Sequence, residues 1–160
     1  MKKSNLVLLS FVPILVGYFI NLTILLPVIG MISLYVLPLV TTAFWFYLGR
    51  QYVRAGWKPV PAILIGNAVG IVSLLIYLWQ FLLVTDEARN LFLAGASQMF
   101  SAATPAWLLA RIAILFESQP NYIGRASMVA MQVLSLVYMI LVFSAGVLWD
   151  KKTGNQASAR

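Results

Sequence analysis

The last apolar run of the chain, residues 126–149, reads ASMVAMQVLSLVYMILVFSAGVLW and contains 24 residues without a charge. A helix that spans a bilayer needs about 20 mostly apolar residues. The run is continuous rather than alternating, which disfavours a β-barrel. Because the hydrocarbon core offers the backbone no hydrogen-bond partner, such a run must satisfy its own polar groups as a helix.

Four further apolar runs precede this one. The expected spans are residues 6–28, 31–49, 60–85, 90–116 and 126–149. We therefore predict an all-α, polytopic transmembrane helix bundle with five spans over residues 1–149, followed by a short polar tail over residues 150–160. The first run is long and lacks a small-residue cleavage site, so it is expected to stay as an uncleaved span.

The fourth run is the weakest of the five. Polar residues and a proline dilute it, namely Ser97, Gln98, Ser101, Thr104 and Pro105. Its apolar character continues as far as Phe116, which gives it the length of a span and favours five crossings. The alternative is four spans, with residues 90–116 forming a re-entrant or interfacial segment.

Composition excludes several classes of protein. Hydrophobic residues make up 62% of the 160 residues and charged residues only 9%, whereas soluble domains are about half apolar and about a quarter charged. A soluble enzyme, a nucleic-acid-binding domain and a disordered chain are therefore excluded. An integral membrane protein remains, and membrane lipids are its first expected partners.

Basic residues predict how the chain is oriented. The chain has 11 Lys and Arg against 4 Asp and Glu, and basic residues concentrate in cytoplasmic connections. With five spans the N-terminus is expected in the cytoplasm and the C-terminus outside. With four spans both termini lie inside, and the charge asymmetry is slightly larger. A bacterial cytoplasmic membrane is the expected location.

The reactive side chains offer little chemistry. The chain contains no Cys and no His, which removes thiolate chemistry and the commonest general base and metal ligand. Its four acids, Asp86, Glu87, Glu117 and Asp150, all fall at the ends of the runs. We therefore expect no enzyme activity, no cofactor and no metal site.

Small residues predict helix-packing surfaces. Gly66 and Gly70 have the Gly-x-x-x-Gly spacing that lets two helix backbones approach closely. In the fourth run, small residues recur at every fourth position around a single amide, Gln98. These predicted packing residues are Ala94, Ala102, Ala106 and Ala110.

Side-chain amides inside the runs predict two polar layers, because an amide that faces lipid would be left without a partner. With five spans, Asn67 and Gln132 lie at similar depth toward the cytoplasmic side, and Gln80 and Gln98 lie toward the outer side. These four residues could line a polar solute path or act as structural glue.

Basic residues near the run ends are candidates for contact with anionic lipid headgroups. They are Arg50, Arg54 and Lys58, which share a spacing of four, and Arg111, the one charge inside the extended fourth run. The sequence thus predicts a small, non-catalytic integral membrane protein that is a subunit or accessory partner of a membrane complex. The alternative is a small homo-oligomeric transporter or channel for a hydrophobic or weakly charged solute, and self-association in the membrane is compatible with both.

Overall fold

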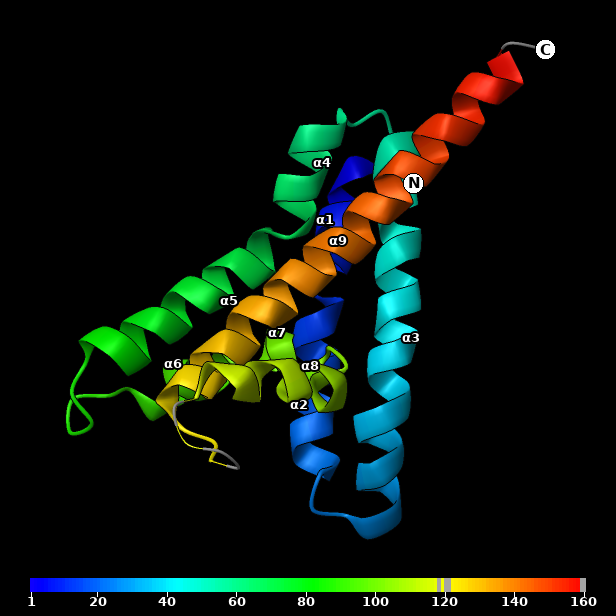
Figure 1. The fold of residues 1–160 in the computed structure, drawn as a ribbon. Coiled ribbons are helices and arrows are strands. Elements are labelled where there is room, and N and C mark those ends of the chain that lie inside the picture. Colours follow the sequence, from blue (N-terminus) through cyan, green and yellow to red (C-terminus); the bar gives the residue numbers. More distant parts are fainter. Residues whose placement is uncertain (118, 120–121, 159–160) are drawn as a thin grey trace.

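The protein is built from helices alone in the part of the chain that the structure describes (Figure 1). This computed structural model describes residues 1–117, 119 and 122–158, with the backbone only for residues 151–158. The helices are α1 (Lys3–Leu9), α2 (Val12–Thr23), α3 (Pro27–Arg54), α4 (Pro59–Gly66), α5 (Ala68–Leu78), η1 (Trp79–Leu83), α6 (Leu91–Ala96), α7 (Met99–Ala102), α8 (Ala106–Ala113), η2 (Ile114–Phe116) and α9 (Arg125–Ser158).

Within the described part of the chain, three stretches are long and apolar enough to cross a membrane: Lys3–Thr23, Pro27–Arg54 and Arg125–Asp150. Two bent pairs of helices would raise the number to five if each pair were one span. These lengths and compositions are compatible with a membrane location. The predicted all-α character is therefore confirmed, with three to five helices long and apolar enough to span a membrane, and the predicted bundle of five spans is not confirmed.

The first two helices form one stretch with a break at residues 10–11. Pro13 lies in the first turn of α2, where a missing N–H costs little, and so it begins a new helix. The Ser10 hydroxyl donates to the carbonyl of Leu6 and lies 2.9 Å from the Tyr52 hydroxyl of α3. The break is thus held to the neighbouring helix by a buried hydrogen bond.

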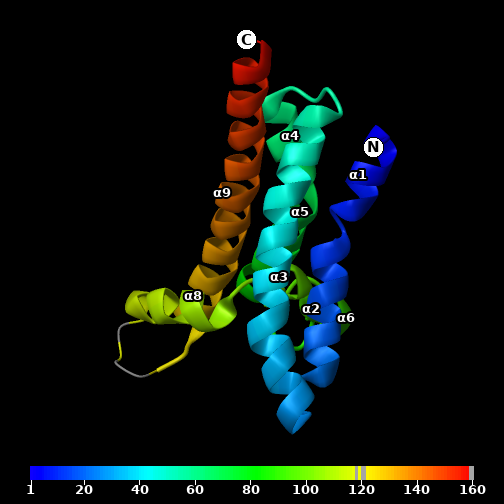
Figure 2. The same cartoon turned by 90° about the vertical axis from the view of Figure 1, so that its right-hand side faces the viewer.

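The core lies where α3 and α9 cross. Figure 2 shows these two helices side by side. Trp45, Tyr52 and Phe143 are fully buried there, and the Tyr52 and Phe143 rings pack edge to face with centroids 5.3 Å apart. Glycines bring the two backbones together: a Cβ added at Gly49 would overlap the Phe143 carbonyl. A Cβ added at Gly146 would overlap the carbonyl of Phe46.

The third predicted span, residues 60–85, is a bent pair. Its two parts, Pro59–Gly66 and Ala68–Leu83, meet at an angle of 47°. Asn67 is the joint, with backbone angles outside the helical region, and its side-chain amide donates to the Ile63 carbonyl. The side chain therefore adds a second hydrogen bond to the Ile63 carbonyl, which also accepts from the Asn67 backbone N–H at 3.1 Å.

The fourth predicted span, residues 90–116, is not a straight helix. Leu91–Ala102 and Ala106–Phe116 meet at 104°. The bend falls at Pro105, which cannot donate a backbone hydrogen bond. Beside it, the buried Thr104 hydroxyl lies 3.0 Å from the Ser135 hydroxyl of α9. This hydrogen bond attaches the bend to α9.

Both ends of this bent segment lie at one end of the molecule (Figure 1). Arg125, which follows it, donates a hydrogen bond to the carbonyl of Phe81, which precedes it. At the opposite end, Asp150 pairs with Arg54 at 2.8 Å, and the Lys3 ammonium lies 5.1 Å from the centre of the Trp57 ring. The N-terminus and residue 150 thus lie at the same end, whereas the five-span prediction separates them.

Candidate functional site

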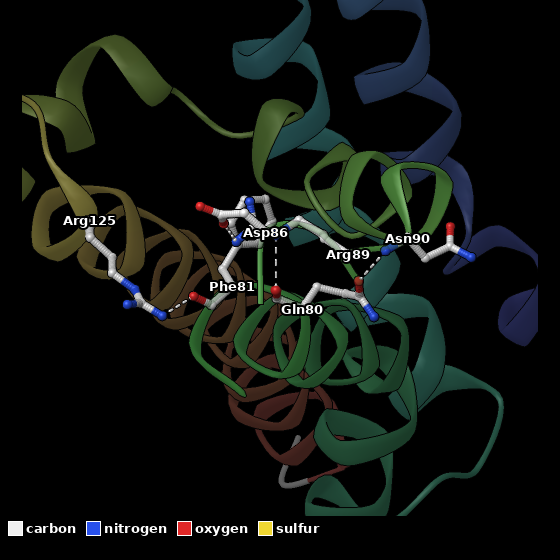
Figure 3. A network of polar contacts seen from close by, with 6 residues as sticks. All are labelled: Gln80, Phe81, Asp86, Arg89, Asn90 and Arg125. Carbon is white, nitrogen blue, oxygen red and sulfur yellow. Dashed lines mark hydrogen bonds and ion pairs between the residues drawn. The ribbon is translucent and has the colours of Figure 1, made fainter. Parts of the chain in front are cut away.

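A polar network joins the end of η1 to the start of α6 and to α9 (Figure 3). The Gln80 side-chain oxygen accepts from the Asn90 backbone N–H at 2.9 Å, and the Gln80 carbonyl accepts from Arg89 Nε at 3.1 Å. The Arg89 guanidinium also pairs with Asp86 at 2.5 Å and lies over the Phe81 ring at 4.5 Å. Three contacts, with the Gln80 carbonyl, the Asp86 carboxylate and the Phe81 ring, therefore hold the Arg89 side chain in one place.

A cavity of about 660 Å³ opens beside this network. Its walls contain the rings of Tyr77 and Phe81, residues 82–85 at the end of η1 and just after it, and the charged residues Asp86, Arg89 and Arg125. Asp86 is paired with Arg89, whereas no carboxylate among the described residues pairs with Arg125. The cavity thus carries one uncompensated positive charge, and Arg125 supplies it.

The N-terminus of α9 is closed by Glu117. One carboxylate oxygen accepts from the backbone N–H groups of Ser127 at 2.7 Å and Gly124 at 2.8 Å. These bonds, with that from Ser127 first, hold the pKa of Glu117 below its usual range because they stabilise the ionised form. The backbone N–H groups of Gly124 and Ser127 at this helix end are therefore already hydrogen-bonded.

A second cavity, of about 250 Å³, has mostly apolar walls that include four uncharged polar side chains. Asn21 comes from α2, Gln98 and Ser101 come from the α6–α7 region, and Gln132 comes from α9. Gln132 is buried, with 7% of the residue exposed. Within the described part of the chain it makes no protein hydrogen bond, so its amide is available to whatever fills this cavity.

The predicted polar layers are not formed as pairs. Asn67 accepts from the Trp45 indole N–H at 3.2 Å, and its neighbour Gly66 faces Phe143. Gln132 precedes Phe143 by eleven positions, which is about 16 Å along a helix. Asn67 and Gln132 are therefore far apart.

The other two amides of the predicted layers are also separated. Gln80 belongs to the network at the end of η1, where its side chain bonds to the backbone of Asn90. Gln98 instead lines the smaller cavity with Gln132, a residue that the sequence assigned to the opposite layer. Which amide lies near Gln98 depends on where the fourth segment bends. The prediction assumed a straight span and therefore placed Gln98 beside Gln80 rather than beside Gln132.

The predicted glycine pair of the third run lies against other helices of the same chain. A Cβ at Gly66 would overlap the Phe143 ring of α9. One at Gly70 would lie 2.6 Å from Cε1 of the Phe100 ring of α7 and 3.0 Å from Cδ1 of Leu136 in α9. Both glycines thus make room for large side chains.

The predicted alanine stripe is divided by the bend. Ala94 is buried in α6, and Ala102 ends α7. Ala106 and Ala110 lie in α8, beyond the 104° bend. The four residues therefore do not form one continuous packing face.

The closest helix approaches involve glycines that the sequence analysis did not select. Gly49 and Gly146 lie at the α3–α9 crossing, and a Cβ at Gly17 of α2 would overlap the Met99 carbonyl of α7. The small-residue run at residues 144–146, in the middle of an otherwise bulky span, is a signal that could have identified one of them.

The predicted headgroup-binding residues separate into two groups. Arg50 and Arg54 both reach Asp150, at 3.4 and 2.8 Å, so part of their charge is balanced within the chain. Lys58 is exposed beside them. Arg111 is exposed on α8, away from this group, and lines an apolar cavity between α8 and α9.

Among the described residues, no group of three or more His, Cys, Asp or Glu side chains could hold a metal ion. Comparison of the chain with protein-family models, curated proteins and solved structures finds no match. The proposed function is therefore based on the sequence and the geometry of the site.

Proposed function

We propose that the chain is a non-catalytic integral membrane protein that crosses the bilayer four times. In this arrangement α1–α2, α3, α4–η1 and α9 are the spans, and residues 91–116 enter and leave on one side. The hydrogen bond from Arg125 to the Phe81 carbonyl supports this topology, because it joins the two ends of the bent segment. The polar cavity of about 660 Å³ supports the same topology, because residues that precede the bent segment and residues that follow it both line it.

The distribution of basic residues supports the same topology. Four spans place eight basic residues on the side of the N-terminus: Lys2, Lys3, Arg50, Arg54, Lys58, Lys151, Lys152 and Arg160. The opposite side receives three: Arg89, Arg111 and Arg125. By the positive-inside rule, both termini are then cytoplasmic.

Single introduced cysteines test this topology, because the chain contains no Cys of its own. Ser4→Cys and Gln156→Cys should react with a membrane-impermeant thiol reagent only from the cytoplasmic side. Ala88→Cys and Gln119→Cys should react only from the other side. A Gln119 variant that reacts together with the Ser4 variant would contradict four spans, because five spans require that result.

The proposed role is that of a subunit or accessory protein within a membrane complex. The use of the carboxylates supports the non-catalytic character of this role. Asp150 connects α9 to α3, Asp86 holds Arg89, and Glu117 closes the end of α9. Three of the four acids thus fasten helices or loops, which favours a structural role over acid–base chemistry.

Purification in a mild detergent tests the role. We expect a second protein to co-purify in a constant ratio, and we expect substitution of Glu87, the acid with no part in these contacts, to leave the complex intact. A homo-oligomer without any partner would contradict the subunit proposal.

A second candidate function is transport of a small uncharged solute. It is favoured by the cavity that Asn21, Gln98 and Gln132 line, because this cavity offers hydrogen bonds without a charge. Flux of a neutral solute such as glycerol into vesicles, reduced by Gln132→Leu, would support transport. Equal flux in vesicles with and without the protein would exclude that solute as the substrate.

A further inference from the structure

We propose that Arg125 and the adjacent face of α9 form a binding site for one anionic phospholipid. The headgroup would lie in the cavity that contains Arg89 and Arg125, and one acyl chain would lie along α9. This inference requires only that α9 crosses the membrane, and it is independent of the proposed subunit role.

Two cavities meet at this point of the molecule. The polar cavity beside the network and a second, apolar groove share Leu82 and Arg125 in their walls. The groove has a volume of about 620 Å³, which lies in the range of roughly 300–1,000 Å³ that is usual for ligand sites. A charged compartment therefore adjoins an apolar one at Leu82 and Arg125, which is the arrangement that an amphiphile requires.

The apolar groove follows α9 into the membrane. Apart from Arg125, its walls are hydrophobic: Leu82, Phe116, Ala126, Val129, Ala130, Val133 and Leu134. From Ala126 to Leu134 the helix rises about 12 Å. One leaflet contributes about half of the roughly 30 Å hydrocarbon core, so the groove has nearly the length that an acyl chain occupies in one leaflet.

Charge complementarity favours an anionic headgroup. Arg125 uses one N–H to bond to the Phe81 carbonyl, and a guanidinium has five. No described carboxylate pairs with it, and the Asp86 carboxylate in the same cavity is already paired with Arg89. A phosphodiester with one negative charge would balance the remaining positive charge and accept hydrogen bonds from Arg125.

The end of α9 does not itself supply the anion site. Glu117 already accepts from the backbone N–H groups of Gly124 and Ser127. A phosphate would therefore be bound by arginine side chains rather than by helix amides. This makes the side chain of Arg125 the determinant of binding, and its substitution is the direct test.

The experiment compares lipid retention by native mass spectrometry after the purified full chain is mixed with phosphatidylglycerol or phosphatidylcholine. The wild-type protein should retain phosphatidylglycerol at least about fivefold better, which corresponds to one basic residue near a lipid surface. Arg125→Gln should abolish this preference. Lys2→Gln replaces an exposed basic residue at the other end of the molecule; it is the matched control and should preserve the preference.

A second pair of variants tests the groove without changing charge. Ala130→Phe fills the groove and should reduce phosphatidylglycerol retention, whereas Ala145→Phe, on an exposed face of the same helix, should not. Equal retention of the two lipids by the wild-type protein would overturn the proposal. An unchanged lipid preference in Arg125→Gln or unchanged lipid retention in Ala130→Phe would also overturn it. The same holds if inorganic phosphate stabilises the protein as much as the phospholipid does.

Discussion

The crossing of α3 and α9 gives the sharpest prediction about stability, because glycines bring their backbones together. A Cβ at Gly49 would overlap the Phe143 carbonyl oxygen and lie 3.3 Å from the Val147 nitrogen. A Cβ at Gly146 would overlap the Phe46 carbonyl oxygen and lie 3.3 Å from the Arg50 nitrogen. Since these neighbours are backbone atoms, the helices must separate to admit a methyl group.

The magnitude follows from two opposing effects. Overpacking in a close contact costs about 1–3 kcal/mol, and replacing glycine by alanine in a helix recovers about 0.5–1 kcal/mol. We therefore expect Gly49→Ala and Gly146→Ala each to lower the free energy of unfolding by about 1–2 kcal/mol. The double variant should lose less than the sum, because one separation of the helices admits both methyl groups.

The assay is reversible unfolding in mixed detergent micelles, with Gly95→Ala as the matched control. An added Cβ at Gly95, in α6, meets no atom within 4 Å. The same substitution should therefore be neutral or stabilising there. If Gly49→Ala were as stable as the wild-type protein, the close approach of α3 and α9 would be refuted.

Three further predictions concern polar contacts. Asn67→Leu removes the acceptor of the buried Trp45 indole N–H and should cost about 1–3 kcal/mol in the same unfolding assay; Trp45→Phe in that background should then cost less than it does alone. Thr104→Val removes the hydroxyl bonded to Ser135 and should cost about 0.5–1.5 kcal/mol, and no loss of stability would show that this bond does not hold the bend. Glu117→Gln should destabilise the protein at neutral pH, because a lowered pKa in the folded state stabilises the fold above the unfolded value of about 4.3. The difference from wild type, measured by thermal unfolding, should shrink as the pH falls through the lower folded pKa, and a constant difference would contradict the capping role.

The positions of most apolar helices could be predicted from the sequence, because run length alone reflects the thickness of a bilayer. Residues 31–49 and 126–149 lie within α3 and α9. Both helices extend beyond these runs, since nothing in the flanking residues ends a helix where the apolar character ends. Helix termini depend on local capping rather than on hydropathy.

The path of the fourth segment could not be predicted from its hydropathy. A proline inside a run predicts a kink, and Pro38 lies inside the continuous helix α3. Pro105 instead coincides with a bend of 104°. Both regions have a threonine whose hydroxyl bonds to α9, Thr42 to Tyr138 and Thr104 to Ser135. The proline and its neighbouring threonine therefore do not reveal which of the two segments bends.

The hydrogen-bond partners in the candidate sites could not be predicted from the sequence either. The prediction that membrane amides turn away from lipid follows from the cost of an unpaired amide, and Asn67 and Gln80 are indeed buried and hydrogen-bonded. Their partners are a tryptophan side chain and a backbone N–H. Neither partner carries a periodic signal in the sequence. Arg89 and Arg125 likewise line one cavity, and their meeting depends on the 104° bend between Leu91–Ala102 and Ala106–Phe116.

One distance tests most directly whether residues 91–116 return to the side of the membrane on which they start. Thr85 and Ile123 line the same cavity, so spin labels on Thr85→Cys and Ile123→Cys should lie well below the roughly 30 Å thickness of the hydrocarbon core when measured by electron paramagnetic resonance in a bilayer. Labels at Ser4 and Ile123, on opposite sides, provide the long reference distance. A Thr85–Ile123 distance equal to that reference would show that residues 91–116 cross the membrane, and it would contradict the four-span account.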